Sequence, residues 1–147
     1  VSFDSIAYKE PPEKFEAGTA PLAEAHGLGL ALDFLSELGM ERVERESLDI
    51  AMRAREMLSR IKGARFVSHP ESRGIVSFHI DGVSPFDVGA LLGEAGVCVR
   101  VGRHCAEPLH SALGLEGSIR ASFGVYNDAR DAEALVSALE KAIRTLG

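Results

Sequence analysis

The second half of the chain alternates short strand patterns with helix patterns, and this alternation constrains the fold more than any other feature. Residues 75–80 alternate apolar and polar side chains, which is typical of a strand with one buried face. Residues 128–146 instead repeat apolar side chains at helical spacing. That stripe consists of Ala132, Leu135, Val136, Leu139, Ile143 and Leu146. The pattern predicts an α+β fold in which helices cover a small sheet.

The other elements follow from the same two periodicities and from turn residues. We expect further strands over residues 1–8, 64–68, 97–100 and 118–123, and further helices over residues 25–38, 41–61 and 85–95. The sheet should be short and mostly antiparallel, with the last three helices on one face. Residues 25–147 should form one small domain, preceded by an extended arm over residues 1–24.

Two of the helices begin with capping signals. Ser84 precedes Pro85, and Asp87 follows three residues after Ser84, which is the spacing of a capping box. Either Asn127 or Asp128 should cap the last helix. These signals fix where both helices begin.

Composition limits the classes of function. A chain of 147 residues with 46% apolar and 26% charged residues is long enough for one domain with a core. A formal net charge of −6 argues against nucleic-acid binding, and no apolar run reaches the ~20 residues of a membrane span. Two cysteines without a disulfide framework, and no secretory signal, favour the cytoplasm. The chain begins at Val1 rather than methionine, so we expect a piece of a longer protein.

Residues 97–108, VCVRVGRHCAEP, carry the strongest candidate for chemistry. They should run from a strand through a glycine into a polar loop that presents Cys105. Positive charge from Arg100, Arg103 and His104 would lower the pKa of the thiol and make it a nucleophile. The alternative is that Cys105 is a small apolar residue of the core.

Two arginines should share one face of the sheet. In residues 97–100 the valines fall on one face and Arg100 on the other; in residues 118–123 the apolar residues likewise leave Arg120 opposite. Arginine suits two-point binding of a carboxylate or phosphate, so the pair predicts a site for a small anionic substrate. The alternative is that each arginine pairs with a nearby acid.

Two weaker patterns complete the candidates. Gly18 and Thr19 can offer a backbone N–H and a hydroxyl to a phosphate, or can form an ordinary turn. His104, Cys105 and His110 are possible metal ligands. Their spacing matches no zinc pattern, and we expect no metal.

Three segments resemble one known family. RVGRHCAEPL over residues 100–109 is similar to the active-cysteine segment of the group II (SufS-type) cysteine desulfurases, which are class V aminotransferases that use pyridoxal 5′-phosphate (PLP). FEAGT over residues 15–19 and IRASFGVYN over residues 119–127 resemble two further segments of that family, in the same order. After Thr19 the chain departs from the family, with Ala20-Pro21 where proline usually comes first.

The resemblance implies a fold and a reaction. The fold would be the small C-terminal domain of an aspartate aminotransferase-like PLP enzyme. The reaction would convert L-cysteine to L-alanine with a persulfide on Cys105, and would supply sulfur through an acceptor protein to iron–sulfur cluster assembly. Arg120, Arg100 and His104 would bind or orient the substrate. Gly18 and Thr19 would contact the PLP phosphate across a homodimer.

The lysines limit what the chain can do alone. The family holds PLP on a lysine in a histidine-lysine segment of a large domain. None of the four lysines, Lys9, Lys14, Lys62 and Lys141, stands in such a segment. We therefore expect the large PLP-binding domain to be absent and the isolated chain to be inactive. The alternatives are a selenocysteine lyase, another class V lyase, or a non-catalytic module that carries a persulfide or binds a partner.

Overall fold

The computed structural model describes residues 3–147, which fall into two compact units. One unit ends at Leu38 and the other spans Gly39–Gly147. The division lies after Leu38 rather than after residue 24, because helix α1 (Leu22–Leu38) buries none of its residues and so belongs to no core.

The first unit has little regular structure besides α1. A short 3-10 helix, η1 (Glu13–Phe15), precedes it. The strand expected over residues 1–8 is absent from residues 3–8, and residues 1–2 lie outside the described part. Many large apolar side chains of this unit are exposed: Phe3, Ile6, Tyr8, Phe15, Leu22, Leu28, Leu30, Leu32 and Phe34.

The second unit is an α+β domain with four antiparallel strands, as the sequence predicts. In chain order its elements are α2 (Met40–Leu58), β1 (Ala64–Phe66), β2 (Ile75–Ile80), α3 (Pro85–Glu94), β3 (Arg100–Gly102), α4 (Glu107–Leu113), β4 (Ser118–Ser122) and α5 (Ala129–Leu146). The strands lie in the order β1-β2-β4-β3, and each neighbouring pair is antiparallel.

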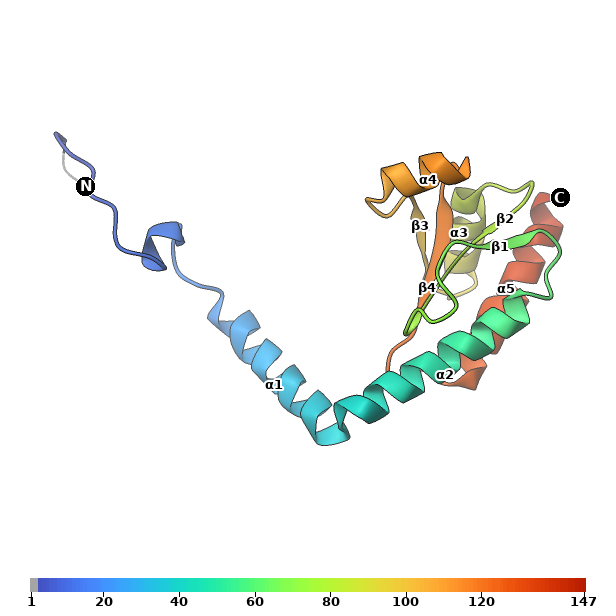
Figure 1. Ribbon diagram of the computed structural model, residues 1–147, viewed down its shortest axis with the longest axis horizontal. Coiled ribbons are helices and arrows are strands. Elements are labelled where there is room, and N and C mark those ends of the chain that lie inside the picture. Colours follow the sequence, from blue (N-terminus) through green and yellow to red (C-terminus); the bar gives the residue numbers. More distant parts are fainter. Residues whose placement is uncertain (1–2) are drawn as a thin grey trace. The chain divides into compact units, whose positions relative to one another are not determined.

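Helices α2, α3 and α5 pack on one face of the sheet, which confirms the predicted arrangement of the last three expected helices (Figure 1). The core joins alternate residues of β2 and β4 to the apolar stripes of these helices. It consists of Ala51, Ala54, Leu58, Val76, Phe78, Ile80, Val88, Leu92, Ile119, Ala121, Ala132, Leu135, Val136, Leu139 and Ala142. Helix α3 lies so close to β3 that a Cβ on Gly89 would come within 2.5 Å of Val101 Cγ1.

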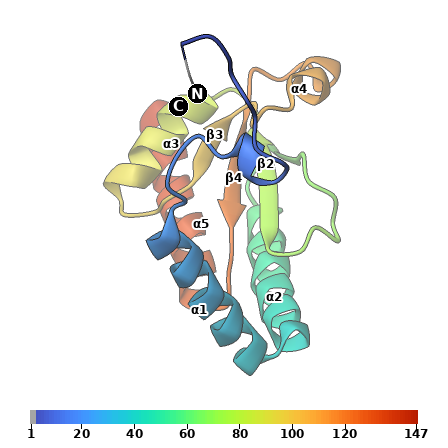
Figure 2. The same ribbon diagram turned by 90° about the vertical axis from the view of Figure 1, so that its left-hand side faces the viewer.

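Within the second unit, the main differences from the expected elements lie around the cysteine segment. The third strand occupies residues 100–102 rather than 97–100, because its partners in β4 are residues 118–120. Helix α4 was not expected; it lies at one end of the sheet, away from α2 (Figure 2). Asp128 caps α5 with a complete capping box, as predicted, whereas the side chain of Ser84 makes no capping bond to α3.

The sheet therefore has one apolar and one polar face. Alternation along β4 places Ile119 and Ala121 in the core and turns Arg120 to the opposite face. The same alternation along β2 places Ser77 and His79 on that opposite face. We call the side without helices α2, α3 and α5 the polar face, and it carries the candidate site.

Candidate functional site

Strand register brings the two predicted arginines together on the polar face. Arg100 of β3 lies directly opposite Arg120 of β4, and Arg120 lies directly opposite Ser77 of β2. Residues directly opposite in an antiparallel pair project to the same face. The structure thus confirms the expected side of the sheet for both arginines, although Arg100 belongs to a strand that begins, rather than ends, at that residue.

Neither arginine has an acidic partner within residues 3–147. The salt bridges of this part of the chain use other arginines, among them Arg65 with Asp81 and Arg73 with Glu44. Arg120 Nε is the one buried side-chain nitrogen or oxygen in the described residues that lacks a hydrogen-bond partner. Like charges directly opposite on neighbouring strands destabilise a sheet, so this pair favours binding of an anion between or above the two guanidinium groups.

Cys105 is exposed and sits in a tight turn that joins β3 to α4. The N–H of Ala106 donates to the carbonyl of Arg103 at 2.8 Å, and the two central residues both have positive φ. His104 has φ 51° and Cys105 has φ 59°, values that favour glycine or asparagine in such turns. Cys105 is therefore neither in the core nor in a relaxed loop, and its thiol is accessible.

The neighbouring side chains tie this turn to the start of β4. His104 Nε2–H donates to the carbonyl of Ser118 at 3.2 Å. Arg103 Nε donates to the carbonyl of Glu116 at 3.0 Å, and Arg103 also forms a salt bridge with Glu107. Arg103 is thus engaged in holding the turn, which leaves Arg100 and Arg120 as the arginines of the polar face without acidic partners.

The pKa of His104 lies below the ordinary histidine value of 6.5. Burial is the main cause, and the positive charges of Arg120 and Arg100 lower the pKa further, while the bond to the Ser118 carbonyl opposes the shift. His104 is therefore uncharged at neutral pH, and the positive field that the sequence assigned to it comes from the arginines alone. With Nε2–H bound to Ser118, Nδ1 is the nitrogen that can accept a proton.

A cavity of about 240 Å³ opens beside the turn on the polar face. Its lining residues are Val67, Ser68, Ser77, His104, Ala106, Leu109, His110, Ser118 and Arg120. His104 and Ala106, the residues on both sides of Cys105 in the sequence, line this cavity, whereas Cys105 itself does not. The volume is below the ~300–1,000 Å³ of ordinary ligand pockets, which suits a small carboxylate or one part of a larger site.

Two buried residues of this site were not predicted as part of it. His110 of α4 is 1% exposed and Ser118 of β4 is fully buried, and His110 Nε2 lies 3.0 Å from Ser118 Oγ. The spacing of Ser118 and Arg120 could have shown that they share a strand face. The place of His110 could not be predicted, because no helix was expected over residues 107–113.

Gly18 and Thr19 lie in the first unit, between η1 and α1, and both are exposed. A Cβ on Gly18 would meet no atom within 4 Å. The backbone around Gly18 and the hydroxyl of Thr19 therefore lie open, a condition that contact with a phosphate requires.

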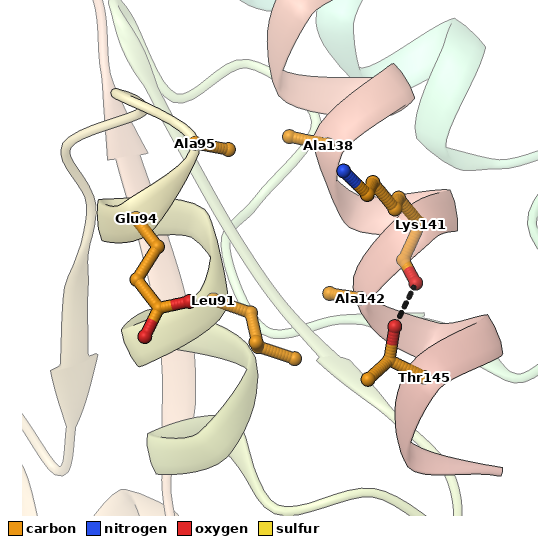
Figure 3. Close-up of a pocket in the computed structure, with 7 residues that line it drawn as sticks. All are labelled: Leu91, Glu94, Ala95, Ala138, Lys141, Ala142 and Thr145. Carbon is orange, nitrogen blue, oxygen red and sulfur yellow. Dashed lines mark hydrogen bonds between the residues drawn. The ribbon is translucent and has the colours of Figure 1, made fainter.

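The lysines do not provide a cofactor anchor on the polar face. All four are exposed, whereas a lysine that forms a Schiff base is activated by desolvation or by nearby positive charge. Lys141 lines a separate cleft of about 210 Å³ between α3 and α5, where its backbone carbonyl accepts a bond from Thr145 (Figure 3). That cleft lies among the helices on the other side of the sheet. The chain's residues fit a substrate carboxylate but not covalent binding of PLP.

Two further features are absent from the described residues. No group of three or more His, Cys, Asp or Glu residues in the described part could hold a metal ion. Among residues 3–147, no helix is long and apolar enough to cross a membrane.

Comparison with known proteins gives one consistent result. The family model "Aminotransferase class-V" matches residues 1–135. A probable cysteine desulfurase of Halalkalibacterium halodurans is 40% identical over 99% of this chain and 36% of its own length. The probable cysteine desulfurase 2 of Mycobacterium leprae is 41% identical over 100% of this chain and 36% of its own. The chain thus spans little more than a third of these curated relatives.

Solved structures agree on the fold. The cysteine desulfurase CsdA of Escherichia coli, in its S-sulfonic acid form, has a TM-score of 0.88 and 36% identity over 100% of this chain and 37% of its own. The apo cysteine desulfurase of Thermococcus onnurineus has a TM-score of 0.85 and 35% identity over 99% of this chain and 37% of its own. The likeness extends over the full chain in both.

Proposed function

This chain belongs to the aminotransferase class-V family, and from that premise we propose that it is the C-terminal part of a group II cysteine desulfurase. The enzyme removes sulfur from L-cysteine and releases L-alanine. The chain contributes the nucleophile Cys105 and the substrate-binding residues Arg120, Arg100 and His104. The large domain that binds PLP lies outside these 147 residues.

The observation that carries this proposal is the unneutralised arginine pair beside an accessible thiol. Arg100 and Arg120 are directly opposite and have no acidic partner, and Arg120 Nε is buried without an acceptor. An α-carboxylate bound there satisfies the buried donor and offsets the repulsion of the two charges. Cys105 is exposed, and its sequence neighbours His104 and Ala106 line the same cavity as Arg120.

Cys105 acts as the sulfur acceptor in this reaction. Its thiolate attacks the sulfur of the substrate, so that an S–S bond forms, the C–S bond breaks and its electron pair stays with the substrate carbon. That carbon then takes up a proton and becomes the methyl group of L-alanine, while Cys105 holds a persulfide. The arginines bind the substrate carboxylate through their positive charge.

PLP supplies the electron sink that this chemistry requires when the large domain holds it. Gly18 and Thr19 lie open for contact with its phosphate, and we place that contact across a homodimer, as the family resemblance implies. The persulfide then passes to an acceptor protein and serves iron–sulfur cluster assembly in the cytoplasm. An exposed Cys105 is compatible with such a transfer.

The test combines the chain with a PLP-loaded large domain of a class V cysteine desulfurase and supplies L-cysteine. We expect L-alanine and a mass increase of one sulfur atom on the peptide that contains Cys105. Cys105→Ser removes both products, whereas Cys98→Ser, which removes the other exposed cysteine, leaves both. Absence of alanine with a folded wild-type chain and a loaded large domain refutes the proposal.

A second candidate is a persulfide-carrying module without its own catalysis. It is favoured by the exposure of Cys105 in the turn between β3 and α4. Such a module takes up a persulfide from a separate complete desulfurase but produces no alanine with the large domain. The same assay therefore separates the two functions.

A further inference from the structure

We propose that His110 and Ser118 form a buried clamp that holds the Cys105 turn in its left-handed conformation, so that His110 is a positioning residue for the sulfur transfer. This inference rests on the proposed function for its catalytic meaning. The clamp itself is a statement about conformation and is tested separately.

The turn needs an external restraint. His104 and Cys105 both have positive φ, although neither is glycine and both carry a Cβ. Each such residue is disfavoured relative to a right-handed or extended backbone. A single backbone bond, from Ala106 N–H to the Arg103 carbonyl, closes the turn. Contacts from outside the turn must therefore compensate for the unfavourable backbone.

His110 reaches the turn from α4. Its Nδ1 lies 3.0 Å from the carbonyl oxygen of Ala106, the residue that ends the turn. A carbonyl only accepts, so Nδ1 carries the proton and donates to it. The α4 backbone bond from His110 N–H reaches the same carbonyl at 3.2 Å. His110 therefore fixes the end of the turn through two donors.

Ser118 supplies the other half of the clamp. With the proton on Nδ1, His110 Nε2 is an acceptor, and the Ser118 hydroxyl donates to it at 3.0 Å. The carbonyl of the same serine accepts from His104 Nε2–H at 3.2 Å, inside the turn. One residue of β4 thus binds the first half of the turn directly and the second half through His110.

Burial makes these bonds strong restraints. His110 is 1% exposed and Ser118 is fully buried, so neither can exchange its partner for bulk water. A buried donor or acceptor that loses its partner costs more than the bond itself contributes. The strand is also anchored, because Ser118 pairs with Gly102, immediately before the turn. The clamp connects the nucleophile's turn to the strand that carries Arg120.

The conformational test uses NMR on the 15.7-kDa chain, with backbone chemical shifts of His104 and Cys105 as the readout of φ. We expect wild-type shifts typical of left-handed residues. In His110→Leu and Ser118→Ala these shifts move toward values of extended or right-handed backbone. His110→Gln retains a donor and an acceptor, and it restores the wild-type shifts at least in part.

A matched control separates the clamp from general destabilisation. Leu139→Ala removes a fully buried side chain of α5 and lowers stability without touching the clamp. It leaves the His104 and Cys105 shifts at their wild-type values. Wild-type shifts in folded His110→Leu overturn the proposal, as does an equal shift change in Leu139→Ala.

Kinetics in the chain combined with the large domain give the catalytic readout. We expect His110→Leu to lower kcat for alanine formation about tenfold or more, because a misplaced nucleophile loses its alignment. KM for L-cysteine stays within about twofold, since Arg100 and Arg120 are unchanged. An active wild type with unaffected variants refutes the positioning role of His110 and leaves the proposed function standing. An inactive wild type with the expected shift changes refutes the proposed function and leaves the clamp standing.

Discussion

The two faces of strand β4 differ in almost every physical respect. Ile119 and Ala121 face the helices and are buried in a core of apolar side chains. Arg120, between them, faces the other way, toward a second arginine and an open cavity. One face is therefore optimised for folding, whereas the other accepts charge repulsion and a buried unpaired donor that contribute nothing to folding.

The polar face of this small α+β domain is the side on which a ligand site is expected. On the apolar face, the side chains of β2 and β4 are buried against the helices of the second unit. On the polar face Arg120 Nε has no hydrogen-bond partner within the described residues, and two guanidinium groups lie opposite each other, which favours binding of a small anion. Substitutions on the two faces should therefore change different measured quantities, stability on one and ligand-dependent activity on the other.

The largest effect should follow from Ile119→Ala on the apolar face. Ile119 is fully buried, so the substitution leaves a cavity and lowers the free energy of unfolding by about 2–5 kcal/mol. Urea denaturation followed by circular dichroism measures this loss. Ile75→Ala is the matched control, because Ile75 is 39% exposed on the neighbouring strand and should cost much less. Equal losses for both would contradict the assignment of the faces.

The next effect should follow from Arg120→Lys on the polar face. The substitution keeps the charge but removes two-point binding, so we expect kcat/KM of the chain combined with the large domain to fall about 10–100-fold. Urea denaturation should show no loss of stability, because Arg120 has no acidic partner to lose in the described residues. Arg65→Lys, on the same face but paired with Asp81, serves as the control and should retain activity.

Sequence periodicity predicted the faces but not the turn. A period of two along residues 75–80 and 118–123 was enough to separate core residues from Arg120, because side-chain direction in a strand depends only on local backbone geometry. The extent of β3 was predicted wrongly. The valines of residues 97–100 favour a strand, but pairing with β4 decides which residues bond, and it selects Arg100–Gly102.

The clamp could not be predicted from the sequence either, because it also depends on tertiary contacts. Positive φ at His104 and Cys105 goes against the preference of both residues, so only tertiary contacts could impose it. Those contacts come from His110 on a seven-residue helix that carried no clear periodicity, and from Ser118 on a strand eight residues later. The two predicted caps show the same limit, since Asp128 bonds as expected whereas Ser84 does not.

A smaller effect should appear in the titration of His104. Its pKa is lowered, so the unfolded chain binds the proton more tightly than the folded chain. The resulting contribution to stability is complete above pH 6.5 and is lost as the pH falls through the lowered value. NMR titration of the imidazole should show a pKa below 6.5. In Arg120→Ala this pKa should rise, because a nearby positive charge is removed, whereas Arg130→Ala should leave it unchanged.

The smallest effect should follow from Asp128→Ala, at the start of a helix that serves the apolar face. Asp128 accepts from Arg130 N–H at 2.7 Å and completes the capping box, and the hydrogen bond from the Arg130 side chain is the main cause of its lowered pKa. We expect a Tm at neutral pH that is lower by a few degrees, with desulfurase activity unchanged, because Asp128 does not line the polar-face cavity.

The effect of Asp128→Ala on Tm should depend on pH. A lowered carboxyl pKa stabilises the fold above the unfolded value of 3.8, and the contribution is lost as the pH falls through the folded value. The difference in Tm between wild type and Asp128→Ala should therefore shrink in acid. Asp128→Asn keeps an oxygen acceptor and should retain most of the cap at neutral pH. A loss of activity in Asp128→Ala below its Tm would show that the two faces are coupled, and would contradict the separate effects on stability and activity expected for them.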